Sequence, residues 1–365
     1  MGGQLRLDSA RDLKLEISDN LTRAFHESLS DSVSIPNRSI LTASALSIRA
    51  DFSVAAGPSI RARTIQRSLS LGLSGRNKNY KLALRVQRQS LLKSPLVDYI
   101  TKQAGNEVDI RFVGRIQKRA SQSTLLWHRC QCRPHLIGSS TGHVAVTAGT
   151  LGAFVREQDG GQLHVLSNNH VFANEDRAAQ GDKLLQPGRS DGGESPRDVF
   201  ASLAAPRGVI KLDSQGRNLV DAALGTLEAP HNFDANLLQG IVQFSNRRLA
   251  GVGPEFVEEG TTVYKIGRTT GVTEGQVTAF ELDDVIVSYD VGNLRFDNQI
   301  EIEGVEEGRP FSDGGDSGAL IVDREMRAIG LLFAGAESGG RCGLGLTYAN
   351  PIHTVLTKLG VELVY

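Results

Sequence analysis

The 365-residue sequence contains few cysteines and no long hydrophobic run. Its three cysteines, Cys130, Cys132 and Cys342, are too few for the disulfide framework that stabilises many small secreted proteins. No stretch of about 18 consecutive apolar residues occurs, so a membrane-spanning helix is not expected. The N-terminal residues also lack the apolar segment of a secretion signal. We therefore predict a cytoplasmic protein without a membrane partner.

The charged residues are distributed unevenly along the chain, although the formal net charge is only −1. Residues 1–135 contain 22 lysines and arginines against 10 aspartates and glutamates, whereas residues 136–365 contain 18 against 31. This asymmetry indicates that the two parts attract each other or that each part binds its own partner. A solvated basic face without any ligand is the alternative.

The pattern of residues divides the chain into three parts, and its length allows two or three domains. Residues 1–79 are polar and basic, and they are predicted to be partly disordered. Residues 80–133 are predicted to form a small β-α-β domain, because two alternating apolar segments flank a helix that begins at Ser94-Pro95 and ends at Gly105. Residues 134–365 form the third part.

The third part is predicted to be mainly antiparallel β structure, because short apolar alternations and glycine turns recur from about residue 140 onward. A final helix is predicted with Asn350 as its cap, Pro351 at its first position and Gly360 at its end. Strands are expected at 150–156, 163–166, 199–203 and 221–227 for a first barrel, and at 262–266, 275–282, 284–289, 299–302, 319–322, 328–333 and 345–348 for a second.

Ser317 is the candidate nucleophile, because it lies between glycines in Gly314-Gly315-Asp316-Ser317-Gly318 and directly precedes an apolar run. Glycine permits left-handed dihedral angles, which bring backbone N–H groups together in a tight turn. Two such N–H groups stabilise the negative oxygen that forms when a hydroxyl attacks a carbonyl. We predict that Gly315 and Ser317 donate these N–H groups. A glycine-rich hairpin without chemistry is the alternative for this segment.

His170 and Asp221 are the candidate partners of Ser317. A serine hydroxyl needs a nearby base, and the base needs an acid that orients it. His170 ends an apolar run and Asp221 lies within another, 51 residues further along and 96 residues before Ser317. Only tertiary folding can bring these residues together. Taken singly, His170 could be an ordinary loop histidine, and Asp221 an edge-strand or turn acid.

These features resemble the trypsin-like (chymotrypsin-fold) serine peptidases, which use the same order of His, Asp and Ser. The resemblance covers roughly residues 134–360 and is closer to a bacterial group related to the plant narrow-leaf protease. The supporting segments are Ala148-Gly149-Thr150-Leu151-Gly152, Leu166-Ser167-Asn168-Asn169-His170-Val171, Asp191-Gly192-Gly193, Lys265-Ile266-Gly267-Arg268-Thr269-Thr270-Gly271, Gly315-Asp316-Ser317-Gly318, Gly330-Leu331-Leu332-Phe333-Ala334-Gly335 and Ala349-Asn350-Pro351-Ile352.

The resemblance implies a serine endopeptidase that forms an acyl-enzyme intermediate on Ser317. It also implies a mainly β fold of two six-stranded antiparallel β-barrels with a C-terminal helix, with His170 and Asp221 on the first barrel and Ser317 on the second. A small α/β domain precedes the peptidase in the bacterial relatives. The expected partner is a protein or peptide substrate, and no cofactor is expected.

The resemblance also indicates a substrate pocket. Phe311 stands six residues before Ser317, where the family sets the base of the pocket. An apolar base disfavours a buried lysine or arginine, so we expect an apolar or small residue before the cleaved bond, although Asp313 is close enough to reverse this preference. Phe333, Ala334 and Gly335 resemble the strand that lines the pocket and pairs with the substrate backbone.

Asp316 raises the question of how the turn is held. In zymogen-activated relatives, this acid pairs with a new N-terminal ammonium that proteolytic cleavage creates. More than a hundred residues precede the barrels here, and no Ile-Val-Gly-Gly segment occurs. We therefore predict that an internal residue replaces the ammonium.

Two further segments have weaker signals. His128, Cys130, Cys132 and His135 are close in sequence, but their spacing matches no standard zinc pattern, so no metal is predicted. The loop 267–271 lacks the Lys-Ser/Thr ending and the following helix of a phosphate-binding loop.

The sequence is also compatible with other functions. One is a catalytically silent trypsin-fold scaffold that acts only through interactions. Another is a peptidase whose basic N-terminal region binds nucleic acid, because residues 49–93 contain ten lysines and arginines against one aspartate. The shortage of aromatic residues there argues against base stacking. A regulatory partner at this basic region is a further interpretation, and the sequence leaves the oligomeric state open.

Overall fold

The computed structural model describes the following residues: 6–30, 68–77, 79–105, 107–117, 126–158, 161–204, 208–229, 232–241, 248–340 and 343–365. Most of the region that was predicted to be partly disordered lies outside these ranges, and so does Cys342. Within the described ranges, no helix is long and apolar enough to cross a membrane.

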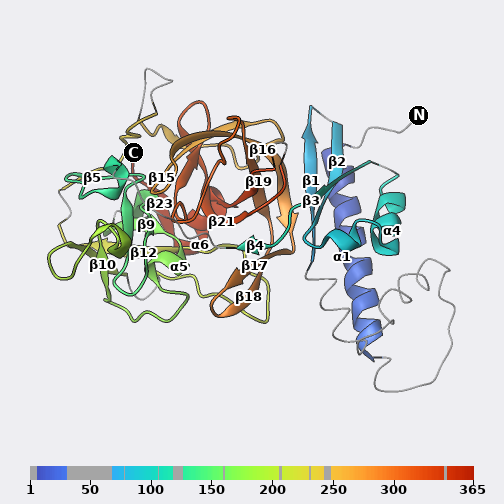
Figure 1. The fold of residues 1–365 in the computed structure, drawn as a ribbon, viewed down its shortest axis with the longest axis horizontal. Helices are drawn as coiled ribbons and strands as arrows, with labels where there is room; N and C mark the ends of the chain where they lie inside the picture. The colour runs from blue at the N-terminus through green and yellow to red at the C-terminus, as the bar shows by residue number, and fades with distance from the viewer. Residues whose placement is uncertain are drawn as a thin grey trace.

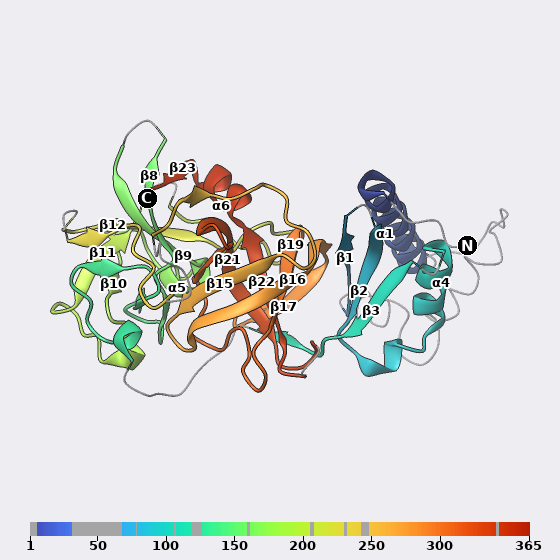
Figure 2. The same ribbon diagram turned by 90° about the horizontal axis from the view of Figure 1, so that it is seen from above.

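In the described residues, an N-terminal unit of three strands and two α-helices precedes the barrels. It consists of α1 (Leu7–Ser30), β1 (Leu69–Arg76), β2 (Asn79–Val86), the short η1 (Gln89–Leu91), α4 (Pro95–Gln103) and β3 (Val108–Phe112). Helix α4 connects the parallel strands β2 and β3, and Ser94 Oγ caps it by accepting the Val97 N–H, as predicted. Helices α1 and α4 cover the face of the sheet that is turned away from the barrels (Figures 1 and 2).

The predicted boundary between residues 79 and 80 differs from the observed structure. Strands β1 and β2 pair along their whole length, from Leu69 opposite Val86 to Arg76 opposite Asn79, so the boundary falls inside a hairpin. Ile17 of α1 packs in the same core as Leu82 and Leu84 of β2. The unit therefore begins at α1, because the β-α-β segment buries its apolar side chains only with α1 and β1 in place.

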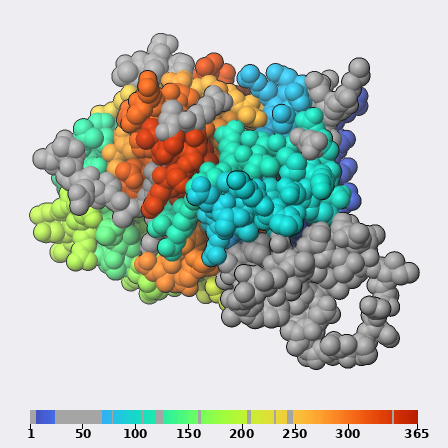
Figure 3. Space-filling view, turned by 45° about the vertical axis from the view of Figure 1, so that its right-hand side comes forward, coloured from blue at the N-terminus to red at the C-terminus, as the bar shows by residue number. Residues whose placement is uncertain are grey.

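The N-terminal unit is joined to the second barrel through backbone pairing and charge. Strand β1 pairs with β16 (Gly271–Asp283), and Gly72 allows the close approach, because a Cβ there would lie 2.8 Å from Leu282 Cα. Lys14 Nζ lies 2.8 Å from Asp283 Oδ2. The completely buried Arg85 and Glu301 form an ion pair in which Arg85 Nε donates to both oxygens of the Glu301 carboxylate, at 2.8 and 2.9 Å. These contacts favour the interpretation that the basic and acidic parts of the chain attract each other, and Figure 3 shows the unit packed on the barrel.

The second barrel is closed and antiparallel, as predicted. Its core is apolar and includes Val263, Val277 and Ile302. The hairpin of β17 (Val285–Tyr289) and β18 (Gly292–Phe296) extends from the barrel. The barrel strands, in pairing order, are β15 (Thr262–Gly267), β16, β19 (Gln299–Gly304), β22 (Leu346–Pro351), β21 (Arg327–Ala336) and β20 (Leu320–Val322), which returns to β15.

The first barrel is an open half-barrel. The order of its strands is β23 (Val361–Leu363), β8 (Ala153–Glu157), β9 (Leu163–Ser167), β12 (Ala223–Leu227), β11 (Val199–Leu203), β10 (Lys183–Leu185), β6 (Ser140–His143) and β7 (Gly149–Thr150). The mainly β class and the closed, six-stranded second barrel are therefore confirmed, whereas the predicted six-stranded first barrel is, in the described residues, a half-barrel of eight strands whose end strands, β23 and β7, do not pair.

Short elements connect these sheets. They are β4 (Ile116–Gln117), η2 (Trp127–Arg129), β5 (His135–Leu136), α5 (Asn169–Phe172), η3 (Arg189–Asp191), β13 (Phe233–Asp234) and β14 (Gly251–Val252). Strand β5 pairs with β13, and β14 pairs with β21.

The C-terminal helix α6 (Ile352–Leu359) is present, but its predicted cap is wrong. Pro351 occupies the cap position and makes no side-chain hydrogen bond to the helix. The Asn350 side chain does not cap the helix, because it bonds to the Asp221 N–H and to Gln299 Oε1 in the core. Gly360 ends the helix in the left-handed conformation, with φ +66°. The chain then continues into β23, which pairs with β8.

Candidate active site

His170 and Asp221 form a buried pair on the first barrel. Strand β9 ends at Ser167, and the single turn of α5 that follows presents His170. His170 Nδ1 lies 2.5 Å from Asp221 Oδ2, and the His170 backbone N–H donates to Asp221 Oδ1 at 3.2 Å. Asp221 is completely buried, and His170 is 8% exposed. The carboxylate holds Nδ1, which leaves Nε2 as the ring nitrogen that can accept a proton.

Both barrels contribute to holding Asp221. Tyr289 at the end of β17 donates its hydroxyl to Asp221 Oδ2 at 2.6 Å, and its ring meets the His170 ring edge to face, with centroids 5.7 Å apart. Asn350 Oδ1 accepts the Asp221 N–H at 3.0 Å, and Asn168 Nδ2 donates to the Asp221 carbonyl at 2.7 Å. Burial, together with the negative charge of Asp221, raises the pKa of Tyr289 well above its usual value, so the hydroxyl stays a donor.

The segment that contains Ser317 meets the segment that contains His170 at one glycine. A Cβ on Gly149 would lie 2.5 Å from a methyl of Val171 and 3.0 Å from the Ser317 carbonyl oxygen. The Thr150 N–H also donates to that carbonyl at 2.8 Å. Across the described residues, no hydrogen bond joins the His170 ring to the Ser317 hydroxyl, a contact that often tightens only when substrate binds.

The turn before Ser317 leaves two backbone donors available. Gly315 has a left-handed φ of +91°, and its carbonyl accepts from Thr150 Oγ1 at 2.9 Å. Among the residues the structure describes, neither the Gly315 N–H nor the Ser317 N–H donates a hydrogen bond. These are the two groups that were predicted to bind an oxyanion.

Asp316 pairs with an internal lysine. Lys265 Nζ lies 3.1 Å from Asp316 Oδ2, and both side chains are completely buried. Asp316 also accepts the N–H groups of Thr269, Thr270 and Asp313 at 2.7, 3.1 and 3.0 Å. Burial disfavours the ionised carboxylate, but Lys265 and these hydrogen bonds outweigh it and lower the pKa of Asp316 below its usual value. Lys265 therefore occupies the role that was predicted for an internal partner.

The predicted pocket residues lie in different environments. The Phe311 ring is 2% exposed and packs in the core of the second barrel beside Gly275. Asp313 is exposed, and its Oδ1 accepts the Gly314 N–H at 2.7 Å. Phe333 is completely buried, with its ring 4.7 Å from that of Phe296. The roles of these residues in a substrate pocket stay predictions.

Strand β4 occupies part of one edge of β21. Near Ser317, the Leu332 N–H and carbonyl pair with Ala319 and Gly318 at 3.0 and 2.8 Å. Further along the strand, Gly335 and Ala336 pair antiparallel with Gln117 and Ile116 of β4. The described part of the chain places no strand on this edge between these two regions, at Phe333 and Ala334. Strand β4 pairs with β17 on its other side, so it lies between β21 and β17.

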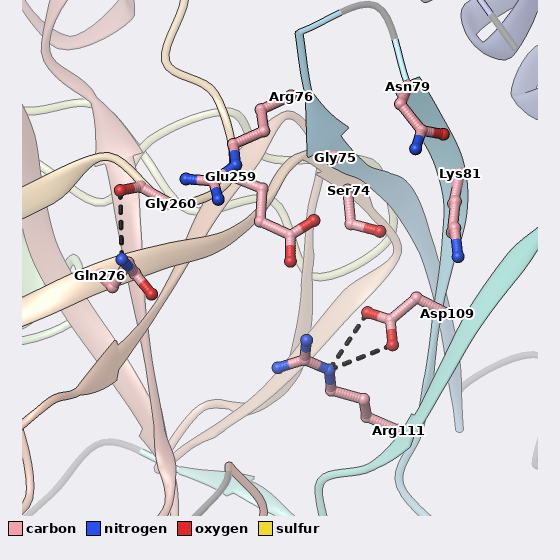
Figure 4. Close-up of a pocket in the computed structure, with 10 residues that line it drawn as sticks. All are labelled: Ser74, Gly75, Arg76, Asn79, Lys81, Asp109, Arg111, Glu259, Gly260 and Gln276. Atoms are coloured by element: carbon pink, nitrogen blue, oxygen red, sulfur yellow. Dashed lines mark hydrogen bonds and ion pairs between the residues drawn. The ribbon is translucent and has the colours of Figure 1, made fainter. Parts of the chain in front are cut away.

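A polar cavity of about 520 Å³ lies between the N-terminal unit and the second barrel (Figure 4). Arg111 Nε lies 3.1 Å from Asp109 Oδ2 in its wall. Its lining residues are Ser74, Gly75, Arg76, Asn79, Lys81, Asp109, Arg111, Glu259, Gly260 and Gln276, none of which belongs to the predicted site. Both signs of charge line this cavity, so it favours no single class of charged ligand.

The histidines near the cysteine pair are buried. In the described ranges, no group of three or more His, Cys, Asp or Glu residues is arranged to hold a metal ion. Neither nitrogen of His128 has a hydrogen-bond partner among the residues that the structure describes, and the ring packs against Trp127. His135 lies beside Phe200 and Arg133. Burial lowers the pKa of each histidine to about 4, and for His135 the Arg133 charge adds to this effect.

Four residues of this site were not identified from the sequence in the roles they have here: Lys265, Tyr289, Asn350 and Thr150. Lys265 and Thr150 lie in segments that the family resemblance singled out, but the sequence did not indicate which residues they would bond to. Tyr289 carried no such signal, because it ends an ordinary apolar strand.

Comparison with known proteins yields only distant structural matches. No protein family matches the sequence, and neither does any curated protein. Thermobifida fusca protease A is 18% identical, with 63% of this chain and 97% of that chain covered and a TM-score of 0.42. A glutamic acid-specific serine protease is 18% identical, with 63% and 100% covered and a TM-score of 0.43. Cellulomonas bogoriensis chymotrypsin is 20% identical, with 63% and 97% covered and a TM-score of 0.39. None of these matches bears on a relationship to the plant narrow-leaf protease.

Because His128 and His135 are buried, the folded protein is expected to lose stability in mild acid. The unfolded chain binds protons on His128 and His135 below about pH 6.5, whereas the folded chain binds them only near pH 4. Their contribution to stability is therefore complete above pH 6.5 and falls as the pH decreases towards 4, with a slope of at most about 1.4 kcal/mol per pH unit for each histidine. Urea unfolding at several pH values measures this slope, and His135→Gln is expected to reduce it. Equal slopes in the variant and the wild type would contradict the prediction.

Proposed function

We propose that this protein is a serine endopeptidase with a His170, Asp221 and Ser317 triad. The observation that supports this proposal best is the meeting of three features at one place. They are the buried His170–Asp221 pair, the approach of the Ser317 carbonyl and of Val171, the residue after His170, to the same glycine, Gly149, and two backbone N–H groups at Gly315 and Ser317 that donate no hydrogen bond within the described residues. A nucleophile, an oriented base and an oxyanion site are the elements of acyl transfer.

The reaction proceeds in two halves. Ser317 Oγ attacks the peptide carbonyl while His170 Nε2 takes its proton, and the Gly315 and Ser317 N–H groups stabilise the tetrahedral oxygen. His170 then protonates the leaving amine, which leaves an acyl group on Ser317. Water hydrolyses this ester with His170 again as the base. Asp221 keeps the ring oriented and stabilises the imidazolium in both halves.

The chain needs no proteolytic cleavage to become active. The Lys265 ammonium supports this part of the proposal, because it pairs with Asp316 at 3.1 Å without any new chain terminus. For the residue before the cleaved bond we propose an apolar or small side chain, which rests on the position of Phe311 six residues before Ser317.

Full-length protein is expected to react with a fluorophosphonate at Ser317 and to cleave peptides from a proteome digest. The Ser317→Ala variant is expected to lose labelling entirely and about a millionfold in kcat, and Asp221→Asn about ten-thousandfold. Mass spectrometry of the labelled protein is expected to show the intact chain. Labelling only after an obligatory cut before the first barrel would disprove the role of Lys265, and no labelling at all would disprove the peptidase.

The hydroxyl of Tyr289 is expected to influence the pH dependence of the reaction. Tyr289→Phe removes one donor from Asp221 Oδ2, so more negative charge acts on the His170 imidazolium and favours it. The acid limb of the kcat/KM profile should therefore move to higher pH by about half a unit to one unit. Tyr348→Phe is the matched control, because Tyr348 is also buried and donates to a buried carboxylate, Glu301, at 3.3 Å. An equal shift in both variants would count against this role.

We further propose that the N-terminal unit regulates the peptidase through β4. Among the described residues, no strand pairs with this edge of β21 at Phe333 and Ala334, which follow Leu332, the partner of Gly318 and Ala319, so an extended peptide that reaches Ser317 would add its strand there. At the next two residues of β21, Gly335 and Ala336, the pairing positions are already filled by Gln117 and Ile116 of β4. A longer peptide can therefore follow this edge only if it displaces β4, which follows β3 of the N-terminal unit in the chain.

Weakening β4 is expected to favour longer substrates. Gln117→Pro removes a backbone N–H and disrupts strand pairing, whereas Gln117→Ala keeps the backbone unchanged and is the control. Only the proline variant is expected to lower KM several-fold for peptides with about four residues before the cleaved bond, and neither should affect peptides with about two. Equal KM values of the wild type and the proline variant for both lengths would refute regulation through β4.

A further inference from the structure

Two of the segments singled out in the sequence meet in a buried ion pair that the triad does not explain. Arg268 follows β15 of the second barrel, and Asp191 ends η3 of the first. Arg268 Nε lies 2.6 Å from Asp191 Oδ2, and Nη2 lies 2.7 Å from Oδ1, which is the paired geometry that a guanidinium forms with a carboxylate. Each side chain is only 4% exposed. Ser140 Oγ also donates to Asp191 Oδ2 at 2.5 Å, which orients the carboxylate.

The guanidinium lies directly against Gly315. A Cβ on Gly315 would lie 2.6 Å from Thr269 Oγ1, 2.7 Å from Arg268 Nη1 and 3.1 Å from Arg268 Cδ, so a larger residue would displace these side chains, and the φ of +91° also favours glycine. Arg268 also holds the loop through its backbone, because its N–H donates to Thr150 Oγ1 at 3.0 Å and Thr150 Oγ1 donates to the Gly315 carbonyl at 2.9 Å.

A chain of hydrogen bonds connects the ion pair to the Gly315 N–H. Arg268 Nη1 donates to Thr269 Oγ1 at 3.4 Å, and Thr269 Oγ1 donates to the Gly314 carbonyl at 2.5 Å. In a trans peptide the N–H points away from the carbonyl of the same peptide unit. Anchoring the Gly314 oxygen on Thr269 therefore sets the direction of the Gly315 N–H, which points away from Thr269.

We propose that Asp191 and Arg268 are a positioning pair that holds the Gly314–Gly315 peptide with its N–H directed at the oxyanion. This inference rests on the proposed peptidase function and adds two residues that do not touch the substrate. Because the pair joins the barrels, it also links the orientation of this donor to their correct packing. Loss of the pair frees the peptide to rotate, which removes one of the two oxyanion donors. Removal of one such donor costs about 100-fold to 1,000-fold in kcat.

The experiment compares kcat, KM and the affinity for a peptide aldehyde, whose hemiacetal oxygen needs the oxyanion site. Asp191→Asn and Arg268→Lys each destroy the paired geometry. Thr269→Val removes the link to Gly314 and the hydrogen bond from Arg268 Nη1, but it keeps the Nε and Nη2 bonds of the ion pair. All three are expected to lose about 100-fold in kcat and a similar factor in aldehyde affinity, with KM changed less than about threefold.

Asp323→Asn is the matched control. Asp323 is 4% exposed and accepts Arg327 Nε at 2.9 Å, with Arg327 Nη2 2.7 Å from the same carboxylate, but it lies in the hairpin between β20 and β21. The Asp323→Asn variant is expected to be less stable than the wild type but to keep its affinity for the peptide aldehyde. Thermal unfolding of every variant separates loss of fold from loss of positioning, and Thr269→Val covers the case in which the charge variants do not fold.

The outcomes separate the two proposals. If the wild type cleaves peptides but the three variants retain kcat and aldehyde affinity, or lose no more than Asp323→Asn, the positioning pair is disproved and the peptidase stands. If the wild type neither cleaves peptides nor reacts with a fluorophosphonate, the peptidase itself fails and the positioning role falls with it.

Discussion

The conformation of the Ser317 turn depends on a carboxylate that is buried without access to water. A charge in such a place is tolerated only when an opposite charge and several donors surround it. Lys265 supplies the charge for Asp316, and the loop after Lys265 supplies N–H donors from Thr269 and Thr270. Removing one member of a buried pair typically costs about 3–5 kcal/mol. The turn and the second barrel are therefore stable as one unit, which keeps the glycines of the turn in a conformation that they would not hold alone.

A second buried carboxylate, that of Asp221, is held by hydrogen bonds from both barrels. Asp221 belongs to the first barrel, but Tyr289 and Asn350 of the second barrel bind its side chain and its backbone. The ion pair of Asp191 and Arg268 crosses the same boundary. The proposed base, His170, and the proposed oxyanion site are thus each held by residues of both barrels. Relative movement of the barrels would disturb both at once, so correct chemistry requires correct packing.

The N-terminal unit is a structural extension of the second barrel rather than a separate attachment. Strand β1 continues the barrel sheet through β16, and Arg85 is buried against Glu301. Strand β4 then passes between β21 and β17, whose last residue, Tyr289, binds Asp221. A change in the position of this unit therefore has a short physical route to the proposed site, through pairing on β21 and through β17.

Local patterns were sufficient to predict the mainly β class and most strands, because alternation and turn glycines are properties of short segments, whereas the candidates His170, Asp221 and Ser317 were chosen from short motifs together with their order along the chain. The chain by itself also determined that the Ser317 turn is rich in glycine and that an acid stands within it. Only the tertiary structure decided that Lys265 neutralises this acid, that Tyr289 reaches Asp221, and that β1 completes the N-terminal sheet. Burial and distance belong to the packed chain, and residues far apart in sequence acquire a partner only when folding removes the water between them.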